Sequence, residues 1–285
     1  MLVDSTFNRA LPNDLFAVLD PARDPIVFDT MTVLAPDAQC LFGGELADAV
    51  RRGSPHVMAM PQPGLLLDWW RQNGRGKSYG IACRGDVGMQ ALRLHLKTLL
   101  RVRLPDGRLV LFRFWDPRVL ETFIKNSTPL EQARLFGPIR TFYGESPEGR
   151  SIAWDRPEGI EVPARSEMQI SPRLYEAFTR ADLFSRLLAF LLERGRRPEF
   201  RAFLERRDAA ASIWDRIWPK LRELPEYLVV ITLTYGLLFD AGFLKTDGHT
   251  TDELIARCLG AAQPDYPMKV AIEESGMLRF SEFDL

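Results

Sequence analysis

The sequence predicts a mixed α/β (α+β) lobe with a small sheet and helices, followed by an all-helical lobe. Short apolar segments alternate with amphipathic ones over the first half of the chain. A Pro-Asp-Gly turn in that half marks a β-hairpin, whereas the second half has long segments with apolar residues at helical spacing. A stretch rich in Pro, Gly and charge, residues 156–170, separates the two. We therefore predict an α/β lobe over residues 1–158 and a helical lobe over residues 159–285.

The first lobe opens with a continuous apolar run at residues 15–19, which ends at Asp20-Pro21 and is typical of a buried strand. Residues 87–100 carry apolar side chains at helical spacing and predict an amphipathic helix. Shorter apolar runs bounded by Gly and Pro fill the rest of this part. We expect further strands at 38–42, 56–60 and 79–83, and further helices at 27–34 and 63–72.

A β-hairpin and a capped helix are the clearest local features of the first lobe. Residues 101–104 alternate polar and apolar, a Pro-Asp-Gly sequence supplies the turn, and residues 108–115 return as a strand. Asp116 is suited to cap the next helix, because it stands directly before Pro117, a residue favoured at the first helical position. We expect another helix at 129–136 and a last hairpin formed by 139–143 and 151–154.

The second lobe is predicted to be helical throughout. Ser171-Pro172 begins a helix that ends at Gly195, and Pro198 begins another that continues to Trp218. Residues 225–241 are rich in β-branched side chains, yet their length favours a buried helix. The remaining start and stop signals predict two more helices, one capped by Thr250 and Glu253 and one between Pro267 and Gly276.

Charge and cysteine content argue against several classes of partner and cofactor. The chain has 37 basic and 38 acidic residues, so its net charge of -1 gives no bulk attraction to nucleic acid or anionic membrane. Its most apolar stretch, residues 227–239, is shorter than the ~20 residues of a membrane span. Cys40, Cys83 and Cys258 are far apart and are expected to be free thiols in a reducing cytosol. No signal peptide is visible at the N-terminus, and we predict a cytoplasmic protein without cofactor, metal, nucleic-acid or membrane partner.

Two features are similar to anion-binding motifs without completing them. The Gly-Arg-Gly-Lys-Ser segment at residues 74–78 resembles the end of a phosphate-binding loop, but Arg71 stands where that loop requires its first Gly. A flexible turn is therefore favoured. Arg101 and Arg103 share one face of the predicted hairpin, and we expect that face to be solvated rather than bound to nucleic acid.

The histidines and cysteines predict no catalytic centre. His56, His95 and His249 have no second His or Cys at metal-ligand spacing, and His95 is expected to be a surface or half-buried residue of its helix. Cys83 has only Arg84 nearby in sequence to lower its thiol pKa, and no Ser lies in a Gly-x-Ser-x-Gly motif. We expect no enzymatic activity. An enzyme whose site is assembled from distant residues remains an alternative, as does a general protein-interaction scaffold.

One segment carries a family resemblance. It is Leu109-Val110-Leu111-Phe112-Arg113-Phe114-Trp115-Asp116-Pro117-Arg118-Val119-Leu120. A turn, a strand ending in Phe-Arg-aromatic-aromatic and an Asp-Pro-Arg helix start resemble the effector-chaperone (adaptor) family of bacterial type VI secretion systems, long described as a domain of unknown function. Residues 15–22, 54–57 and 94–97 resemble other stretches of that family in the same order, although His56 replaces the usual aromatic residue. Together they span roughly residues 15–140.

The resemblance implies a protein that binds a cognate toxin effector and the trimeric spike protein or its extension domain, without catalysis or cofactor. Arg113, Asp116, Pro117 and Arg118 match the family signature. They could bind a partner, or Asp116 could only cap a helix while the arginines buttress the sheet. The helical lobe would supply effector specificity. The acidic, amphipathic C-terminal segment, residues 277–285, could dock on a partner or pack on its own domain.

Overall fold

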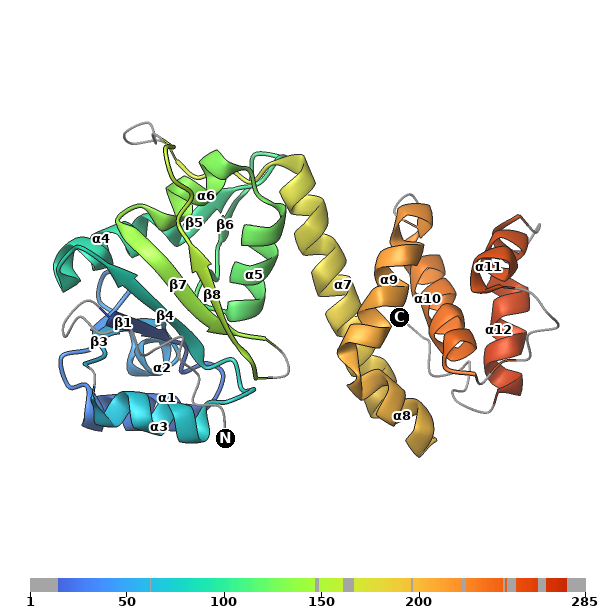
Figure 1. Ribbon diagram of the computed structural model, residues 1–285, viewed down its shortest axis with the longest axis horizontal. Helices are drawn as coiled ribbons and strands as arrows, with labels where there is room; N and C mark the ends of the chain where they lie inside the picture. The colour runs from blue at the N-terminus through green and yellow to red at the C-terminus, as the bar shows by residue number, and fades with distance from the viewer. Residues whose placement is uncertain are drawn as a thin grey trace. The chain divides into compact units, whose positions relative to one another are not determined.

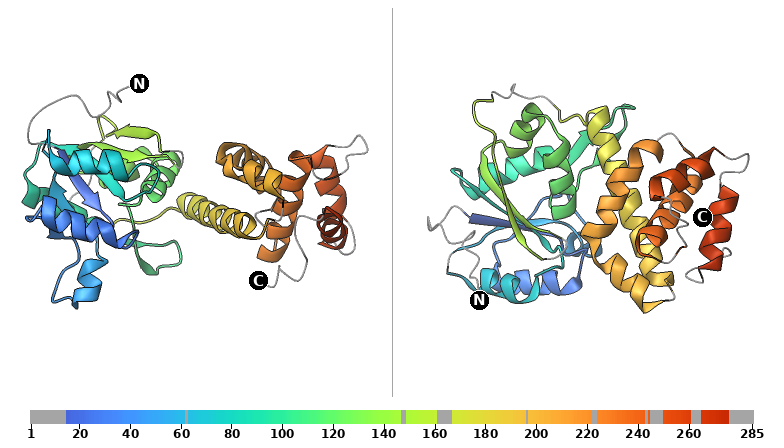
Figure 2. Two further views of the ribbon diagram at one scale, coloured as in Figure 1. Left: turned by 90° about the horizontal axis from the view of Figure 1, so that it is seen from below. Right: turned by 45° about the vertical axis from the view of Figure 1, so that its right-hand side comes forward.

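The chain divides into two compact units, residues 1–179 and residues 180–285 (Figures 1 and 2). The division falls inside helix α7 (Pro172–Arg194). Met168, Ile170 and Leu174 lie in the core of the first unit, which therefore extends past the junction predicted at residue 158. The predicted division into lobes at residues 1–158 and 159–285 stays a prediction. The computed structural model describes residues 15–275 except 62, 147–148, 161–166, 196, 222–223, 243, 245–249 and 261–264.

The first unit is built on a six-stranded sheet with the order β2-β3-β1-β4-β7-β8, in which all neighbouring strands are antiparallel. Strand β1 lies at the centre, and its Phe16 stands opposite Ala59 on one side and Cys83 on the other. The strands are β1 (Leu15–Leu19), β2 (Gln39–Cys40), β3 (His56–Ala59), β4 (Gly80–Gly85), β7 (Ile139–Glu145) and β8 (Ser151–Asp155).

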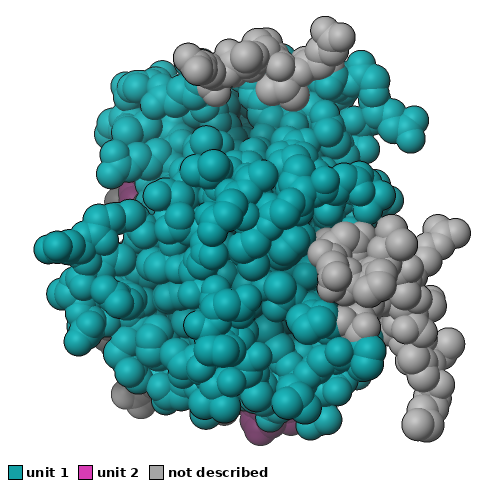
Figure 3. All heavy atoms as spheres, turned by 90° about the vertical axis from the view of Figure 1, so that its left-hand side faces the viewer, with its two compact units in different colours: residues 1–179 teal, residues 180–285 magenta. Residues whose placement is uncertain are grey.

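Both faces of this sheet are covered, because the side chains of β1 alternate between two cores. Leu15, Ala17 and Leu19 pack with the helices α1 (Pro25–Leu34) and α3 (Leu65–Asn73). Phe16 and Val18 pack on the opposite side, where α4 (Met89–Leu99), α5 (Pro117–Asn126) and α6 (Pro129–Phe136) lie (Figure 1). Figure 3 shows one face of this unit in a space-filling view, with residues 1–179 in teal. The predicted α+β lobe with a small sheet is confirmed.

The predicted β-hairpin forms a second, two-stranded sheet of β5 (Arg101–Arg103) and β6 (Leu109–Leu111). Its turn contains Gly107 at φ +85°, a backbone conformation that favours glycine. Strand β6 ends at Leu111, four residues before the predicted end, because the chain turns at residues 113–116 toward α5. On the other side of the hairpin, Arg103 N–H donates to Met168 O at 3.0 Å and Arg103 O accepts from Ile170 N at 2.9 Å.

The second unit is helical, as predicted. Helix α10 (Glu226–Asp240) packs against α9 (Arg207–Leu221), α11 (Thr251–Leu259) and α12 (Asp265–Glu274). Its side chains from Leu228 to Tyr235 are all buried, including Thr232 and Thr234, so the prediction of a buried helix here is confirmed. Thr234 satisfies its hydroxyl by donating to Val230 O at 2.9 Å. The capping box of Thr250 and Glu253 is present at the start of α11.

Several predicted helices differ from those in the structure. The single helix predicted from Pro198 to Trp218 is two helices, α8 (Pro198–Glu205) and α9, because Arg206 has a non-helical ψ of 72°. Four consecutive charged residues at 205–208 leave no apolar side chain to hold a helical turn there. Helix α12 begins at Asp265 rather than at Pro267, and the predicted stop at Gly276 lies outside the described residues, as does the segment 277–285. The short helix α2 (Asp48–Arg52), which buries no residue, was not predicted.

We predict that Gly80→Ala destabilises the first unit strongly. A Cβ at this position would lie 2.1 Å from Val18 O and 2.9 Å from Leu19 Cα, so β1 and β4 would have to separate. Overpacking of this kind costs about 1–3 kcal/mol or more. The control is Gly53→Ala, where the nearest atom would be 3.7 Å away and φ is -91°. Urea unfolding of both variants measures the effect, and equal midpoints would contradict the prediction.

Candidate functional site

Arg113, Asp116, Pro117 and Arg118 lie in the turn that joins β6 to α5 and in the first two residues of that helix. Phe114 and Trp115 at the middle of this turn are buried in the core below it, so the turn is fixed in place. Asp116 N–H donates to Arg113 O at 2.9 Å and closes the turn. Asp116 then caps α5 by accepting a hydrogen bond from Arg118 N at 3.0 Å, with Pro117 at the first helical position. The predicted cap is therefore present.

Two arginine–aspartate pairs surround this turn. Arg118 binds Asp116 through two hydrogen bonds, Nη2 to Oδ2 at 2.6 Å and Nε to Oδ1 at 2.9 Å. Arg113 Nη2 donates to Asp20 Oδ2 at 2.6 Å, and Asp20 directly follows β1. Asp20 also accepts from Ala22 N at 3.2 Å. The second pair joins residues 93 positions apart in sequence and connects the end of the central strand to the turn before α5.

The two acids are buried and the two arginines are not. The side chains of Asp20 and Asp116 are 3% and 5% exposed, whereas those of Arg113 and Arg118 are 45% and 42% exposed. Burial alone would raise the pKa of Asp116, but the hydrogen bonds and charge of Arg118 and the charge of Arg23 outweigh it, so that this pKa is lowered. Asp20, Arg23, Arg113, Asp116 and Arg118 form what we call the charge cluster, which has one net positive charge.

The charge cluster is suited to binding rather than to proton transfer. Asp116 stays ionised at neutral pH, since its pKa is lowered. Both of its oxygens already accept hydrogen bonds from Arg118. In contrast, the guanidinium groups of Arg113 and Arg118 keep part of their surface in solvent. A partly exposed guanidinium held in one geometry can donate to a carboxylate of a partner with little further loss of side-chain entropy.

The loop that resembles a phosphate-binding loop holds a carboxylate of its own chain. Gly76 N–H donates to Glu145 Oε2 at 2.8 Å, and Ser78 N–H donates to Glu145 Oε1. Gly76 and Ser78 have positive φ values of 74° and 53°, which turn their amides toward this acid. The loop therefore binds an anion, but the anion is the side chain of β7 next to it. This clamp joins residues 67–69 positions apart and was missed by sequence reasoning.

The other candidate groups are engaged or inaccessible. His56 is buried and its Nδ1 lies 2.9 Å from Ser54 O. His95 is half-buried, as predicted, and its Nε2 lies 2.9 Å from Leu135 O. Burial lowers the pKa of both imidazoles. Burial also raises the pKa of the Cys83 thiol to about 12, so a thiolate nucleophile is disfavoured at neutral pH. His249 lies outside the described residues.

The described part of the chain has neither a cluster of metal-ligating residues nor a membrane-spanning helix. Among those residues, no three His, Cys, Asp or Glu side chains are grouped as a metal ion would require. Within the same residues, no helix is both long and apolar enough to cross a membrane.

Comparison with known proteins gives a match over part of the chain. Residues 15–134 match a family model described as "Domain of unknown function (DUF4123)". The matched stretch lies in the first unit and contains β1, the hairpin and the whole charge cluster. No curated protein and no solved structure matches the chain significantly.

Sequence reasoning identified part of the charge cluster. Arg113, Asp116, Pro117 and Arg118 were predicted together, and the structure places them in one turn. Asp20 and Arg23 were missed as cluster members, because Asp20 was interpreted only as the end of a strand. A polar residue directly after a buried strand lies at the edge of the sheet, and that position was the available signal.

We predict that Asp116→Asn lowers stability by about 1–2 kcal/mol at pH 7, the value of a charge-assisted hydrogen bond in a partly exposed pair. Asn also caps helices well, so the loss of stability measures the contribution of the negative charge rather than that of the cap. The folded pKa of Asp116 is lowered, so this contribution is present above about pH 4 and is lost as the pH falls through the folded pKa. Urea unfolding between pH 6 and pH 2.5 should therefore show the two proteins converging at low pH.

The matched control is Asp106→Asn in the β5–β6 turn. Asp106 pairs with Arg108 at the same two-residue spacing, but these side chains are 47% and 66% exposed. Solvent screens such a pair, so we expect little change at any pH. Equal losses in the two variants would contradict a special role for the buried acid.

Proposed function

We propose that this protein is an effector chaperone or adaptor of a bacterial type VI secretion system. In this role it binds a cognate toxin effector in the cytoplasm and loads it onto the spike protein or its extension domain. The observation that carries the proposal is the segment from the hairpin to α5, whose sequence resembles that family. The match of residues 15–134 to a domain of unknown function supports it, because the resemblance covers nearly the same residues.

The arrangement of the charge cluster supports a binding role and no catalysis. Its buried acids are bound to arginines, whereas its arginines remain partly exposed. In the proposal, Arg113 and Arg118 receive acidic side chains of a partner, and Asp20 and Asp116 hold them in position. No cofactor is needed for this role.

The helical unit would provide effector specificity. Most side chains of α10 are buried in its core, so the fold of this unit depends on one central helix. The outer helices can then vary on their exposed sides without loss of that core. Tyr227 at the start of α10 and Val270 in α12 are apolar side chains that remain exposed, at 53% and 36%. Apolar groups of this kind are common at the centre of protein interfaces.

The direct test is to tag the protein in its native host and identify what co-purifies at moderate salt. Recovery of a toxin-like protein together with a spike protein is the expected result. Recovery of neither, from cells with an active secretion apparatus, would contradict the proposal. A small-molecule substrate turned over by the purified protein would instead favour an enzyme.

We predict that Arg113→Glu and Arg118→Glu together weaken binding of one partner by about tenfold or more, because both exposed donors are replaced by like charges. Co-purification and the dissociation constant of the purified pair measure the effect. The control is Arg52→Glu in α2, whose arginine is 55% exposed and also binds an aspartate, Asp29, at 2.8 Å. Equal binding by both variants would show that the charge cluster is only structural.

We predict that exchanging residues 180–285 for those of a paralogue redirects effector choice. The exchange point is residue 180, because Leu174 and Phe178 at the start of α7 pack in the core of the first unit and should stay with it. Co-purification with each effector gives the result. If the chimaera is folded and still selects the original effector, the helical unit does not determine specificity.

A further inference from the structure

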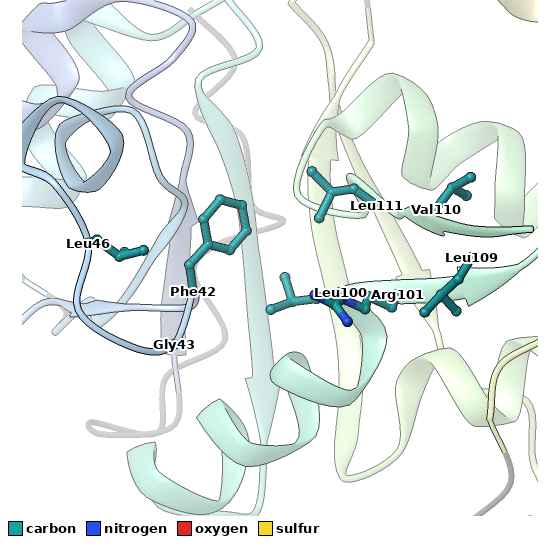
Figure 4. Close-up of a pocket in the computed structure, with 8 residues that line it drawn as sticks. All are labelled: Phe42, Gly43, Leu46, Leu100, Arg101, Leu109, Val110 and Leu111. Atoms are coloured by element: carbon teal, nitrogen blue, oxygen red, sulfur yellow. The ribbon is translucent and has the colours of Figure 1, made fainter.

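The first unit has an apolar groove beside the β5–β6 hairpin, with a volume of about 610 Å³. One wall is the loop that follows β2, and the other is the hairpin itself (Figure 4). Phe42 and Leu46 project from the loop toward Leu111 across the groove (Figure 4). The lining residues are Phe42, Gly43, Leu46, Leu100, Arg101, Leu109, Val110 and Leu111.

Two leucine side chains of strand β6 line this groove. Leu109 and Leu111 are 44% and 52% exposed, and they lie on the same face of the strand. Val110 between them points to the other face and packs on the core. Leucines in this pattern on a short hairpin are costly in water unless a partner covers them.

The backbone of β6 is open on its outer side. Phe112 N–H donates to Leu100 O at 2.9 Å, so the backbone groups of Phe112 face the β5 side. In an antiparallel pair, neighbouring residues point their backbone groups in opposite directions. Leu111 and Leu109 therefore direct their N–H and C=O groups away from β5. Within the described part of the chain, no backbone hydrogen bond reaches these outward groups.

Strand β6 is short, with three residues, but it has no charged residue and no proline to protect its open edge. Natural edges carry a charge, a proline or an inward-pointing charged residue that prevents pairing with another strand. Leu109, Val110 and Leu111 have none of these. An open edge next to an apolar groove is the arrangement that binds an extended peptide as an added strand.

The groove carries positive charge. Arg101 is the one charged residue among the described residues that line the groove, and it stands opposite Leu111 in the hairpin. Arg101 is exposed and makes no ion pair with any described residue. Lys97 adds a second positive charge, since its Nζ would lie 3.3 Å from a Cβ at Gly43. Glu45, on the same loop, does not line the groove.

We propose that the groove binds an extended segment of a partner polypeptide that pairs with β6 as an added strand. The segment has apolar side chains at alternate positions, which contact Leu109, Leu111 and Phe42. It carries an acidic residue at the end that lies near Arg101. This inference deepens the proposed function, since the segment would belong to a protein that the adaptor holds, but the binding chemistry follows from the groove alone.

The experiment is a selection from a phage-displayed library of random nonapeptides on the full-length protein. Alternating apolar residues with at least one Glu or Asp should be enriched. Fluorescence polarisation of the best peptide then gives its dissociation constant for each variant. No enrichment, or enrichment of basic or non-alternating peptides, would overturn the proposal.

The variants separate side-chain contacts from backbone pairing. Arg101→Glu should weaken peptide binding by about tenfold or more, the effect of a charge reversal. Leu109→Pro removes the outward N–H without removing a bond to β5, and it should weaken binding well beyond Leu109→Ala. Equal binding by the proline and alanine variants would overturn the added strand. Leu94→Ala, at an exposed leucine of α4 outside the groove, is the control and should bind normally.

A change in the peptide gives the same test without any change in the protein. N-methylation at alternate backbone positions removes the N–H groups that would face β6, so one of the two alternate patterns should abolish binding and the other should not. Equal effects of both patterns would overturn the proposal. If an effector or spike protein co-purifies but Leu109→Pro leaves the complex intact, this inference fails and the adaptor role stands. If peptides bind but neither protein co-purifies, the adaptor role fails and this inference stands.

Discussion

The first unit depends on β1, the central strand that is buried on both faces. All five of its side chains are buried, and they divide between the two cores that hold α1 and α3 on one side and α4 to α6 on the other. A change in its register by one residue would move every side chain to the wrong core. Gly80 brings β4 close enough to pair with it. Asp20 directly follows the same strand, so the position of the charge cluster is fixed by the centre of the sheet.

Local signals allowed most elements to be predicted, whereas their assembly could not be. The apolar run at 15–19, the Pro-Asp-Gly turn and the cap at Asp116 each act within a few residues, and each is present in the structure. The strand order and the pair of Asp20 with Arg113 depend on contacts across most of the unit. The break at Arg206 was missed because the prediction relied on the spacing of apolar residues. A run of charged residues contains none, so it gives no sign of where the helix stops.

The candidate site shows the same division. Arg113, Asp116, Pro117 and Arg118 were found together because they are close in sequence. The cap that Asp116 provides for α5 follows from the Asp-Pro sequence alone. The reason that the arginines hold a fixed geometry is not local, because it needs a buried acid from the end of β1. The Glu145 clamp is a second case, in which a loop with a suggestive sequence already holds an anion from another strand. Spacing within a motif cannot indicate whether its ligand is internal.

A short sequence motif can mark the fold, the interface or both, and the exposed fractions of its side chains help to separate these roles. Asp116 and Pro117 are buried and form the helix start, so their presence is explained by the fold. Arg113 and Arg118 are different, because their guanidinium groups keep over two-fifths of their surface in solvent and can also contact a partner. Leu109 and Leu111 are exposed apolar side chains of the hairpin, and they are available to a partner in the same way. The hairpin and the turn after it therefore contain both the structural part and the exposed part of one continuous segment.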